Sequence, residues 1–360
     1  MTPPLTVSVI IPNYNYGDYV GAAIQSALNL DWPDVEVIVV DDGSTDHSRA
    51  VIAGFGSRIS AILQENAGQL SACNEGFSRS RGEIVVFLDS DDLLAPSLVR
   101  EVAAVWTPRA SKVQVQMQVI DATGEPTGSY FPQYAIVPSP EQVRAWMLAA
   151  GTYPTPPGSG NVYARWFLAR IFPLREVCGK ASDTCPIAAA PLLGEVLTIP
   201  RPLVRYRVHG RNQGALAWLD VPRFNQEVTR LLQQHAYART MAARAGLAFS
   251  DGALKRSLEY LPYRIASLKL APSRHALQGD TLLRVLCHFA AASFAPQGMP
   301  PRARLLLFAW ACAVALSPGR LAGRLILWRF ASVARPRALR SLLIWLKVMS
   351  RPGVQRTRFS

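Results

Sequence analysis

The sequence predicts an α/β protein in which helices flank a mostly parallel sheet, followed by a basic helical region. Three observations support this fold class. Short β-branched runs alternate with segments of helical periodicity over the first hundred residues. Polar residues suited to ligand binding come directly after three of those runs. The whole excess of positive charge falls in the last 80 residues.

Three short apolar runs near the N-terminus are predicted to be buried strands, because each is bounded by turn-forming residues. They are residues 7–11 (VSVII), 35–40 (VEVIVV) and 83–88 (EIVVFL). The segments between them are expected to be helices, at residues 19–30, 48–55 and 69–78. Strands that alternate with helices form right-handed βαβ units, so we expect a mostly parallel sheet.

The middle of the chain is predicted to add further strands and a long helix. Residues 112–121 (KVQVQMQVID) alternate strictly and predict a half-exposed strand. A loop rich in proline and glycine follows at residues 153–161, and residues 203–210 (LVRYRVHG) resemble another strand. Residues 221–245 predict a helix that Gly246 ends.

Composition excludes several classes of protein. Abundant apolar residues and only 18% charged residues exclude intrinsic disorder. A uniformly basic nucleic-acid-binding protein is excluded, because residues 1–280 hold 25 basic and 25 acidic residues, whereas residues 281–360 hold 13 basic and none acidic. An odd number of scattered cysteines argues against a disulfide scaffold, and we expect all five to be reduced structural thiols: Cys73, Cys178, Cys185, Cys287 and Cys312.

No stretch of the sequence predicts a signal peptide or a membrane-spanning helix. The N-terminus has no basic region followed by an apolar stretch and a cleavage site. The longest apolar run, residues 305–316, has 12 residues, whereas a spanning helix needs about 20.

Polar residues follow the first, second and third predicted strands. Residues 12–15 (PNYN), 41–42 (DD) and 89–92 (DSDD) occupy these positions. In parallel sheets, ligands bind at the carboxyl ends of the strands. We therefore expect the functional site at this edge.

Four segments within residues 6–98 resemble the glycosyltransferases of family 2, which have the nucleotide-sugar-binding GT-A fold. They are VSVIIPNYNYGDYV, EVIVVDDGSTDHS, ENAGQLSACNEGF and RGEIVVFLDSDD, in the family's order, and weaker similarity continues to about residue 213. The resemblance implies an inverting, metal-dependent enzyme that moves a sugar from a nucleoside diphosphate, most often UDP, to a hydroxyl of a glycan or lipid-linked acceptor. It also implies a role in surface polysaccharide or glycolipid synthesis.

The resemblance implies that the nucleotide sugar is bound by residues of all four segments. Asp42 would accept a hydrogen bond from the base, Asp41 would support its loop, and Tyr14 would stack on the base unless it packs in the rim of the fold. Arg81 would contact the donor or, alternatively, close a surface loop. The complete expected set is Pro12, Tyr14, Asn15, Asp42, Asn66, Gly68, Asn74, Arg81, Asp89 and Ser90.

The resemblance also implies a divalent cation, Mn²⁺ or Mg²⁺, held by Asp91, Asp89 and His209. Carboxylates are suitable ligands for a cation that neutralises a leaving diphosphate. The alternative is that residues 89–92 form only an acidic turn that caps a helix. For His209 the alternative is a packed or surface histidine.

An inverting transfer needs a base for the acceptor hydroxyl, and the resemblance implies Asp183. The alternative is a solvated loop aspartate. The glycines and Ser159 of the loop at residues 153–161 are expected to shape the acceptor side. Two departures from the family pattern, Cys73 where arginine is frequent and Ser182 where glutamate is frequent, favour the alternative of a catalytically degenerate nucleotide-sugar-binding or scaffold protein.

The predicted domains are a GT-A domain (1–215, divided near residue 110 into nucleotide-sugar and acceptor parts), a helical extension (216–280) and a basic helical region (281–360). An apolar segment at 305–316 and an amphipathic one at 337–349 suit binding to an anionic membrane surface. We therefore expect a cytoplasmic protein, peripheral on the inner face of the plasma membrane. The alternative is a helical subdomain whose apolar faces pack on the body or on a second copy.

Overall fold

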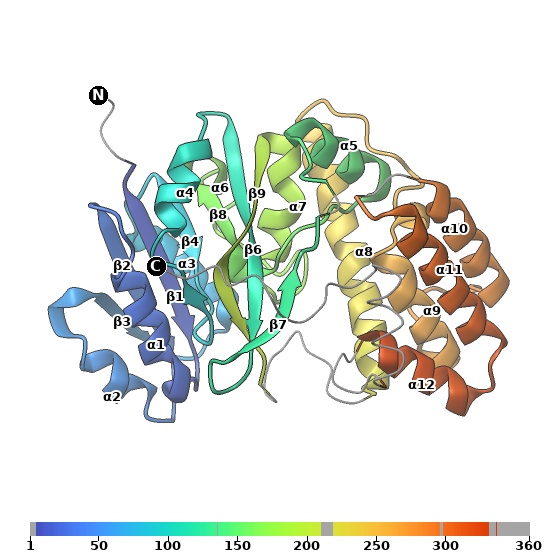
Figure 1. Ribbon diagram of the computed structural model, residues 1–360, viewed down its shortest axis with the longest axis horizontal. Helices are drawn as coiled ribbons and strands as arrows, with labels where there is room; N and C mark the ends of the chain where they lie inside the picture. Colours follow the sequence, from blue (N-terminus) through green and yellow to red (C-terminus); the bar gives the residue numbers. More distant parts are fainter. Residues whose placement is uncertain (1–4, 135, 210–218, 296–297, 331–335, 337–360) are drawn as a thin grey trace.

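The sheet lies at the centre of one half of the molecule and a bundle of helices forms the other half (Figure 1). The computed structural model describes residues 5–134, 136–209, 219–295, 298–330 and residue 336. The strands are β1 (Val7–Asn13), β2 (Val35–Asp42), β3 (Ser60–Gln64), β4 (Ile84–Phe87), β5 (Leu93–Leu94), β6 (Ala110–Ile120), β7 (Pro126–Phe131), β8 (Asn161–Ala164) and β9 (Glu195–Arg207).

Helices cover both faces of the sheet and continue beyond it. They are α1 (Gly17–Leu28), α2 (Ser48–Ala53), α3 (Gln69–Arg79), α4 (Leu98–Val105), α5 (Pro140–Ala150), α6 (Arg165–Leu168), α7 (Thr184–Leu193), α8 (Val221–Arg244), α9 (Tyr260–Leu270), α10 (Leu282–Phe294), α11 (Pro301–Leu316) and α12 (Gly319–Phe330). Short 3₁₀ helices are η1 (Gly56–Arg58), η2 (Gly158–Gly160), η3 (Leu254–Arg256) and η4 (Pro272–Arg274).

The strand order is β3-β2-β1-β4-β8-β6-β9-β5, and β7 pairs with β6. The first four strands in this order run parallel, as the alternation of strands and helices predicts. β8 is antiparallel to both of its neighbours, and β9 runs parallel to β6. Because β1, β2 and β4 are parallel, Asn13, Asp42 and the turn after Phe87 lie at one edge, where the site was expected.

Alternate residues of the strands supply two separate cores, one on each face of the sheet. Val9 and Ile11 face the core that α1 and α4 cover. Ile10 and Val85 face the other core, to which α5, α6, α7 and the end of α8 contribute. Both faces are thus apolar and covered, which is the arrangement expected for parallel strands.

The strand predicted at residues 112–121 is present as β6, but the prediction that one of its faces is exposed is wrong. β6 lies between β8 and β9, and its polar residues are buried with partners. Lys112 Nζ donates to Thr155 Oγ1 and Asn161 Oδ1, both at 2.8 Å, and Gln114 Nε2 donates to Thr198 Oγ1. Burial lowers the pKa of Lys112 well below its usual value. The sequence of β6 alternates apolar and polar residues as a half-exposed strand does, but its polar side chains find hydrogen-bond partners inside the protein.

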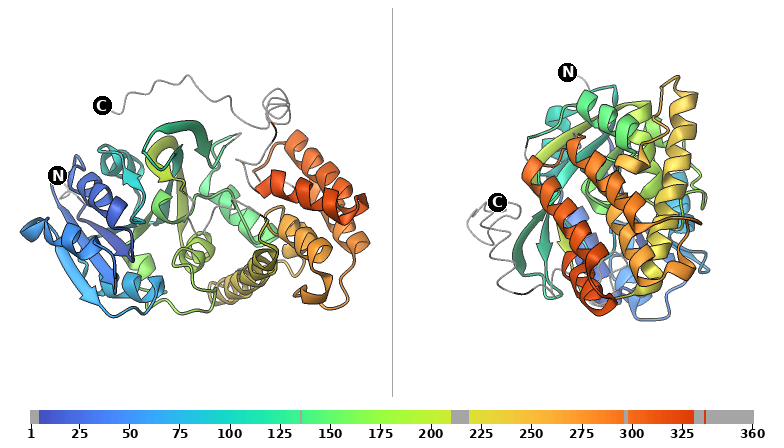
Figure 2. Two further views of the ribbon diagram at one scale, coloured as in Figure 1. Left: turned by 90° about the horizontal axis from the view of Figure 1, so that it is seen from below. Right: turned by 90° about the vertical axis from the view of Figure 1, so that its right-hand side faces the viewer.

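Helices α8 to α12 share one apolar core, to which Phe224, Leu261, Phe289, Leu307 and Ile326 belong. They form a stack at the end of the molecule remote from β3 (Figure 2). We call residues 219–330 the helical unit. The boundary predicted at residue 280 lies between α9 and α10, and α10, α11 and α12 all pack on α9.

The helices in the described part of the chain are all too short or too polar to cross a lipid bilayer. The apolar run at residues 305–316 forms most of α11 and packs against α9, α10 and α12. The amphipathic segment predicted at residues 337–349 lies outside the described residues.

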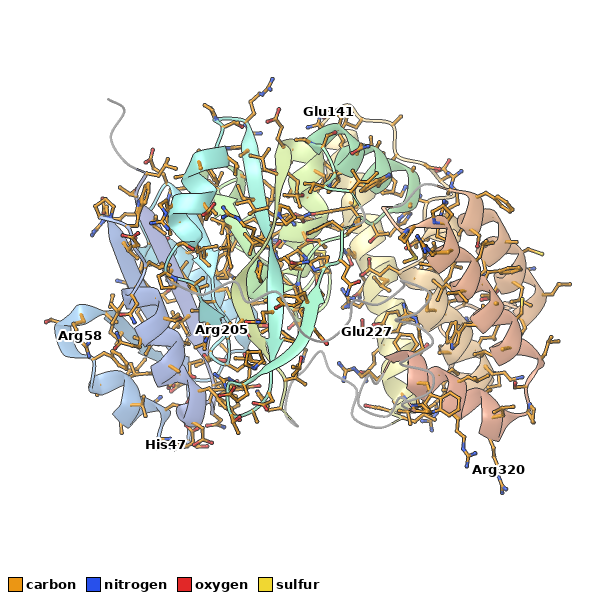
Figure 3. All side chains as sticks on the ribbon, viewed as in Figure 1. His47, Arg58, Glu141, Arg205, Glu227 and Arg320 are labelled. Atoms are coloured by element: carbon orange, nitrogen blue, oxygen red, sulfur yellow. A yellow bond between two sulfur atoms is a disulfide. The ribbon has the colours of Figure 1, made fainter. Side chains whose placement is uncertain are left out.

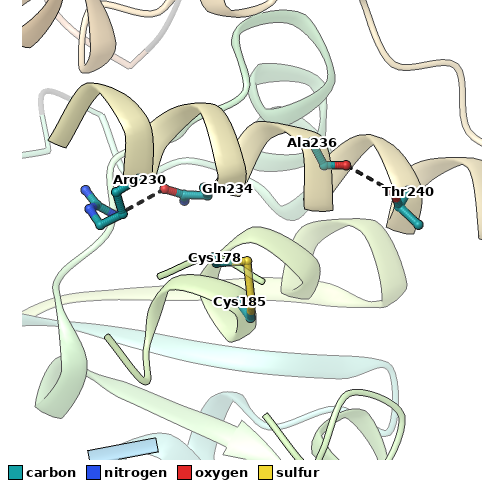
Figure 4. The surroundings of a disulfide bond; sticks show 6 residues. All are labelled: Cys178, Cys185, Arg230, Gln234, Ala236 and Thr240. Carbon is teal, nitrogen blue, oxygen red and sulfur yellow. Dashed lines mark hydrogen bonds between the residues drawn. A yellow bond between two sulfur atoms is a disulfide. The ribbon is translucent and has the colours of Figure 1, made fainter. Parts of the chain in front are cut away.

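The prediction that all five cysteines are reduced is wrong for two of them. Cys178 and Cys185 form a disulfide beneath α8 (Figure 4), whereas Cys73, Cys287 and Cys312 are free. The two partners are seven residues apart, and the loop between them also holds Asp183. Spacing alone gave no reason to pair these two among five.

Candidate active site

The acidic turn, residues 89–92, follows β4 and is fixed from a neighbouring loop. Ser159 Oγ accepts a hydrogen bond from the Asp89 N–H at 3.0 Å and donates to Asp92 Oδ2 at 2.7 Å. The Ser90 hydroxyl donates to the Pro12 carbonyl at 2.7 Å, which joins the turn to the end of β1. The predicted proximity of these segments is confirmed, and Ser159, which was expected on the acceptor side, hydrogen-bonds the acidic turn.

Arg207, the last residue of β9, closes the turn from the opposite side. Its N–H donates to Asp92 Oδ1 at 3.0 Å, and its Nε donates to the Asp91 carbonyl at 2.9 Å. Arg205, two residues earlier on the same strand, lies in the middle of the molecule (Figure 3). Arg207 is buried, so it holds the shape of the turn through backbone contacts.

His209 lies in contact with Asp91, while their role as metal ligands stays a prediction. His209 Nε2 lies 3.0 Å from Asp91 Oδ2, and only 4% of the His209 side chain is exposed. Two aromatic residues near the start of α1 hold the ring. Tyr19 stacks on it at 4.8 Å between ring centroids, and Tyr16 meets it edge-on at 5.6 Å. The sequence analysis missed this pair, because only the folded chain brings α1 to β9.

The acidic turn carries more negative charge than its surroundings neutralise. Burial, then the charges of Asp91 and Asp183, raise the pKa of Asp89 to about 8. Burial also raises the pKa of Asp91, against the lowering effect of the His209 hydrogen bond, and raises that of Asp92 well above its usual value. A divalent cation would relieve this repulsion.

The donor set fits a divalent metal ion in its chemistry. Within the described residues, no three histidine, cysteine or acidic side chains already surround one point as a metal site. The carboxylates of Asp89 and Asp91 are nevertheless ligands that both Mn²⁺ and Mg²⁺ accept, and the imidazole of His209 favours a transition-metal ion such as Mn²⁺ over Mg²⁺. Burial is the main cause of the raised pKa of Asp89, and the charges of Asp91 and Asp183 add to it.

Gly158, the first residue of η2, joins the acidic turn to Asp183. Its N–H donates to Asp183 Oδ2 at 3.0 Å. A Cβ atom built on Gly158 would lie 2.7 Å from Asp89 Oδ2. Gly158, which has no side chain, therefore lies between Asp183, the expected base, and Asp89, which is expected to bind the nucleotide sugar. The structure places these two predicted residues close together.

The two departures from the family pattern are neighbours. Cys73 is fully buried on α3, and Ser182 lies near its thiol. Burial raises the pKa of Cys73 to about 12. The two positions at which this chain departs from the family pattern therefore lie close together, and both hold uncharged side chains.

The residues predicted for the base pocket meet at the ends of β1 and β2. Asn15 Oδ1 accepts from the Thr45 N–H at 2.8 Å, and Asp41 accepts from Asn13 and Arg49. The support predicted from Asp41 is thereby confirmed. Tyr14 is 45% exposed at this rim.

Asp42 is held by the loop before α3. It accepts hydrogen bonds from the Ala67 N–H at 2.9 Å, the Gly68 N–H at 2.8 Å and the Gln64 side chain. Gly43 has a φ of +81°, and a Cβ there would lie 2.7 Å from the Asn66 nitrogen. The structure therefore gathers Asp42, Asn66 and Gly68, while base recognition by Asp42 stays a prediction.

Asn74 and Arg81, which were predicted to bind the nucleotide sugar, contact other parts of the protein instead. The Asn74 side chain donates to the Leu174 carbonyl and accepts from the Leu174 N–H. Arg81 precedes β4 and pairs with Asp34 and Glu36 at the amino ends of the parallel strands. Arg81 is thus at the edge opposite the acidic turn, and the alternative of a surface arginine that closes a loop is the correct one.

The chain is similar in sequence to named glycosyltransferases. Residues 8–165 match the family model described as glycosyl transferase family 2. An uncharacterised glycosyltransferase of Nostoc sp., alr2836, is 35% identical over 218 residues, which cover 58% of this chain and 66% of that protein. The putative teichuronic acid biosynthesis glycosyltransferase TuaG of Bacillus subtilis is 42% identical over 90 residues, covering 24% and 36%. The match therefore spans about two thirds of the first relative and about one third of the second.

Among solved structures, residues 1–349 of TarS from S. aureus, in complex with UDP-GlcNAc, give a TM-score of 0.49 at 18% identity, covering 90% of this chain and 92% of that one. The family match includes β1, β2, the acidic turn and the loop of Gly158. Residues 8–165 of the chain belong to glycosyl transferase family 2, and similarity to a protein named as a glycosyltransferase extends over 218 residues.

Proposed function

We propose that the protein is a metal-dependent, inverting glycosyltransferase that moves a sugar from a UDP-linked donor to a hydroxyl acceptor. The observation that carries this proposal is the placement of Asp89 and Asp183 on two sides of Gly158. A direct displacement needs the donor and the base that activates the acceptor at adjacent positions.

In the proposed reaction, Asp183 takes the proton of the acceptor hydroxyl as its oxygen attacks the anomeric carbon. The bond from that carbon to the diphosphate breaks, and the nucleoside diphosphate leaves with the electron pair. Asp91, Asp89 and His209 would hold Mn²⁺ or Mg²⁺, which neutralises the charge of the departing diphosphate. Ser159 and Arg207 keep the acidic turn in place during this step.

Nucleotide binding is proposed at the other end of the same sheet edge. Tyr14 offers an exposed ring for stacking on the base, and Asp42 would accept from a uracil N–H. The residues that surround Asp42 also hold it in one orientation. A role in surface polysaccharide or glycolipid synthesis is proposed as well, and the name of the relative TuaG supports it.

The proposal is tested by incubating the full chain with Mn²⁺ and a panel of nucleotide sugars and measuring released nucleoside diphosphate. We expect release from one UDP-sugar. Asp91→Asn should abolish it, and Asp183→Asn should slow transfer by about 10²–10⁴-fold, the usual contribution of a general base. Asp251→Asn changes a carboxylate whose side chain is 91% exposed and serves as the control. Wild-type transfer by Asp183→Asn would refute the assignment.

We further propose peripheral binding to the inner, anionic face of the plasma membrane from the cytoplasm. The support is the excess of 13 basic residues in positions 281–360 together with apolar side chains exposed on α10, α11 and α12. They are Leu283, Phe294, Leu305, Leu316 and Leu321. Arg320 lies at the same end of the molecule (Figure 3). Sedimentation with anionic vesicles should be strong for the wild type and weakened by Leu283→Ser/Phe294→Ser, and equal binding by both would contradict the idea.

A further inference from the structure

A cavity of about 200 Å³ lies beside Asp183, where the sheet meets the helical unit. The loop at residues 151–157 and the start of α7 form one wall. Arg230 and Gln234 of α8 and Glu259, just before α9, complete it. The helical unit therefore contributes side chains to a cavity that also contains the expected base.

The side chains from the helical unit are held in defined positions. Arg230 Nε donates to Glu227 at 2.9 Å, and Arg230 Nη1 donates to Gln234 Oε1 at 3.3 Å (Figure 4). Glu259 accepts a hydrogen bond from the Thr152 hydroxyl across the junction. A guanidinium has five N–H donors and a carboxylate has two oxygens. These contacts orient both groups and leave hydrogen-bonding capacity toward the cavity.

Thr184, the first residue of α7, also lines the cavity and is 2% exposed.

We propose that this cavity binds the ring of a neutral acceptor sugar and that Arg230 and Glu259 determine which acceptor is used. This inference rests on the proposed glycosyl transfer. The volume is below that of drug-sized sites, roughly 300–1,000 Å³, and suits one sugar ring. The charges around the cavity favour a neutral sugar over an acidic one. Two carboxylates, Asp183 and Glu259, line the cavity, and the arginine there, Arg230, is already paired with Glu227.

The position of the cavity agrees with the direction of transfer. Pro156 and Pro157 line it, and the next residue, Gly158, contacts Asp89 on the side of the acidic turn. An acceptor hydroxyl would approach Asp183 from the cavity, while the donor lies beyond Gly158. The helical unit thereby becomes the part of the chain that selects the acceptor.

The test compares the wild type, Arg230→Gln and Glu259→Gln with Arg239→Gln. Arg239 lies on the same helix, is exposed, pairs with Asp251 and is not part of the cavity. Saturation-transfer NMR would measure binding of methyl glucoside, methyl galactoside, methyl N-acetylglucosaminide and methyl glucuronide. The same glycosides would serve as acceptors, and the ratio of transfer to donor hydrolysis would be measured.

We expect a neutral glycoside to bind and the glucuronide to be excluded. Arg230→Gln should weaken binding and lower the ratio of transfer to hydrolysis about tenfold, the effect of losing one hydrogen bond to a charged group. Arg239→Gln should match the wild type. Glu259→Gln is isosteric and leaves the Arg230–Glu227 pair, so it provides the test if Arg230→Gln does not fold.

Two failures are distinguishable in this design. If both cavity variants bind every glycoside as the wild type does, or if the glucuronide is preferred, the inference is overturned. If no donor is turned over but a neutral glycoside binds and Arg230→Gln or Glu259→Gln abolishes the signal, the cavity is confirmed and the proposed transfer is refuted.

Discussion

Gly158 shows how a single missing side chain can define a site. Its N–H orients Asp183, and its α-carbon leaves just enough room for the carboxylate of Asp89. Any side chain here would push these two groups apart. Glycine is needed here because the Asp89 carboxylate approaches the backbone closely, and not because of the backbone conformation, since the φ of Gly158 is not positive.

Gly158→Ala is expected to lower nucleoside diphosphate release at least about tenfold, since misplacement by a fraction of an ångström is costly at a reacting centre. Its Cβ would meet the tip of the Asp89 side chain, which can rotate away, so the thermal midpoint should change little. Release assays and thermal unfolding measure the two effects. At Gly319 a Cβ would meet nothing within 4 Å, so Gly319→Ala is the matched control. Equal activity of the two variants would contradict this role of Gly158.

The acidic turn predicts how metal affinity depends on pH. The pKa of Asp89 is raised from 3.8 to about 8, so the folded state binds more protons than the unfolded state between these values and loses stability as pH rises through that range. A bound cation favours the ionised form. The thermal midpoint gained on adding Mn²⁺ should therefore be larger at about pH 8 than at about pH 6. A gain independent of pH, or one that is unchanged in Asp89→Asn, would count against this assignment.

At the residue scale, the sequence predicted the residues whose chemistry is local. Asp89, Asp91 and His209 were named from short motifs, and the structure places His209 Nε2 at 3.0 Å from Asp91 and the charge of Asp91 near Asp89, while metal binding by these residues stays a prediction. The stacking of Tyr19 on His209 was not predictable, because it depends on how far α1 reaches over β9. Arg81 was misplaced because a motif does not tell which edge of a sheet a preceding residue occupies.

At the scale of elements, the loop between Cys178 and Cys185 positions Asp183 as much as the sheet does. The disulfide side chains are buried together with Leu174 against α3 and α8. This anchors both ends of the loop, and Gly158 holds Asp183 within it.

Reduction of this disulfide is expected to lower the free energy of unfolding by about 2–3 kcal/mol, the value for a short closed loop, and to slow transfer. Urea unfolding and transfer assays with and without dithiothreitol measure both effects. Cys178→Ser/Cys185→Ser should behave like the reduced wild type and should not respond to dithiothreitol. If dithiothreitol changed the stability or activity of that variant, the effect would come from another cysteine and not from this disulfide.

Helical periodicity predicted α1, α3 and α8 well, because each has one apolar face, and short β-branched runs bounded by turn residues predicted the buried strands β1, β2 and β4. All six elements lie within a few residues of their predicted positions. The prediction failed where polar residues of a strand have buried partners and where a helix is buried on all sides. β6 has both faces covered. α7 is buried on all sides, so its apolar residues do not gather on one helical face, and the helix was not predicted from its periodicity.

At the scale of the whole molecule, the helical unit is continuous with the sheet through α7 and α8. Ala238 and Met241 of α8 enter the core on one face of the sheet, while Phe224 and Val228 of the same helix enter the core of the helical unit. A single helix therefore couples the two halves.

Truncation after residue 280 should expose the core of the helical unit, because α10–α12 supply Phe289, Leu307 and Ile326. We expect that variant to aggregate or to lose its cooperative thermal transition. Truncation after residue 336 retains every described helix and should keep the transition. Size-exclusion chromatography and calorimetry distinguish the two, and a monomeric, cooperatively folding 1–280 variant would contradict a shared core.

The hydrogen bond from Arg207 to Asp92 spans 115 positions, and this separation has a consequence for synthesis. At 5–20 residues per second, a ribosome releases Arg207 roughly 6 to 23 seconds after Asp92. During that interval the emerging chain has the three carboxylates of the acidic turn but neither the arginine nor the histidine that face them. The nascent N-terminal strands can therefore pair early, whereas the catalytic edge is completed only when β9 enters the sheet.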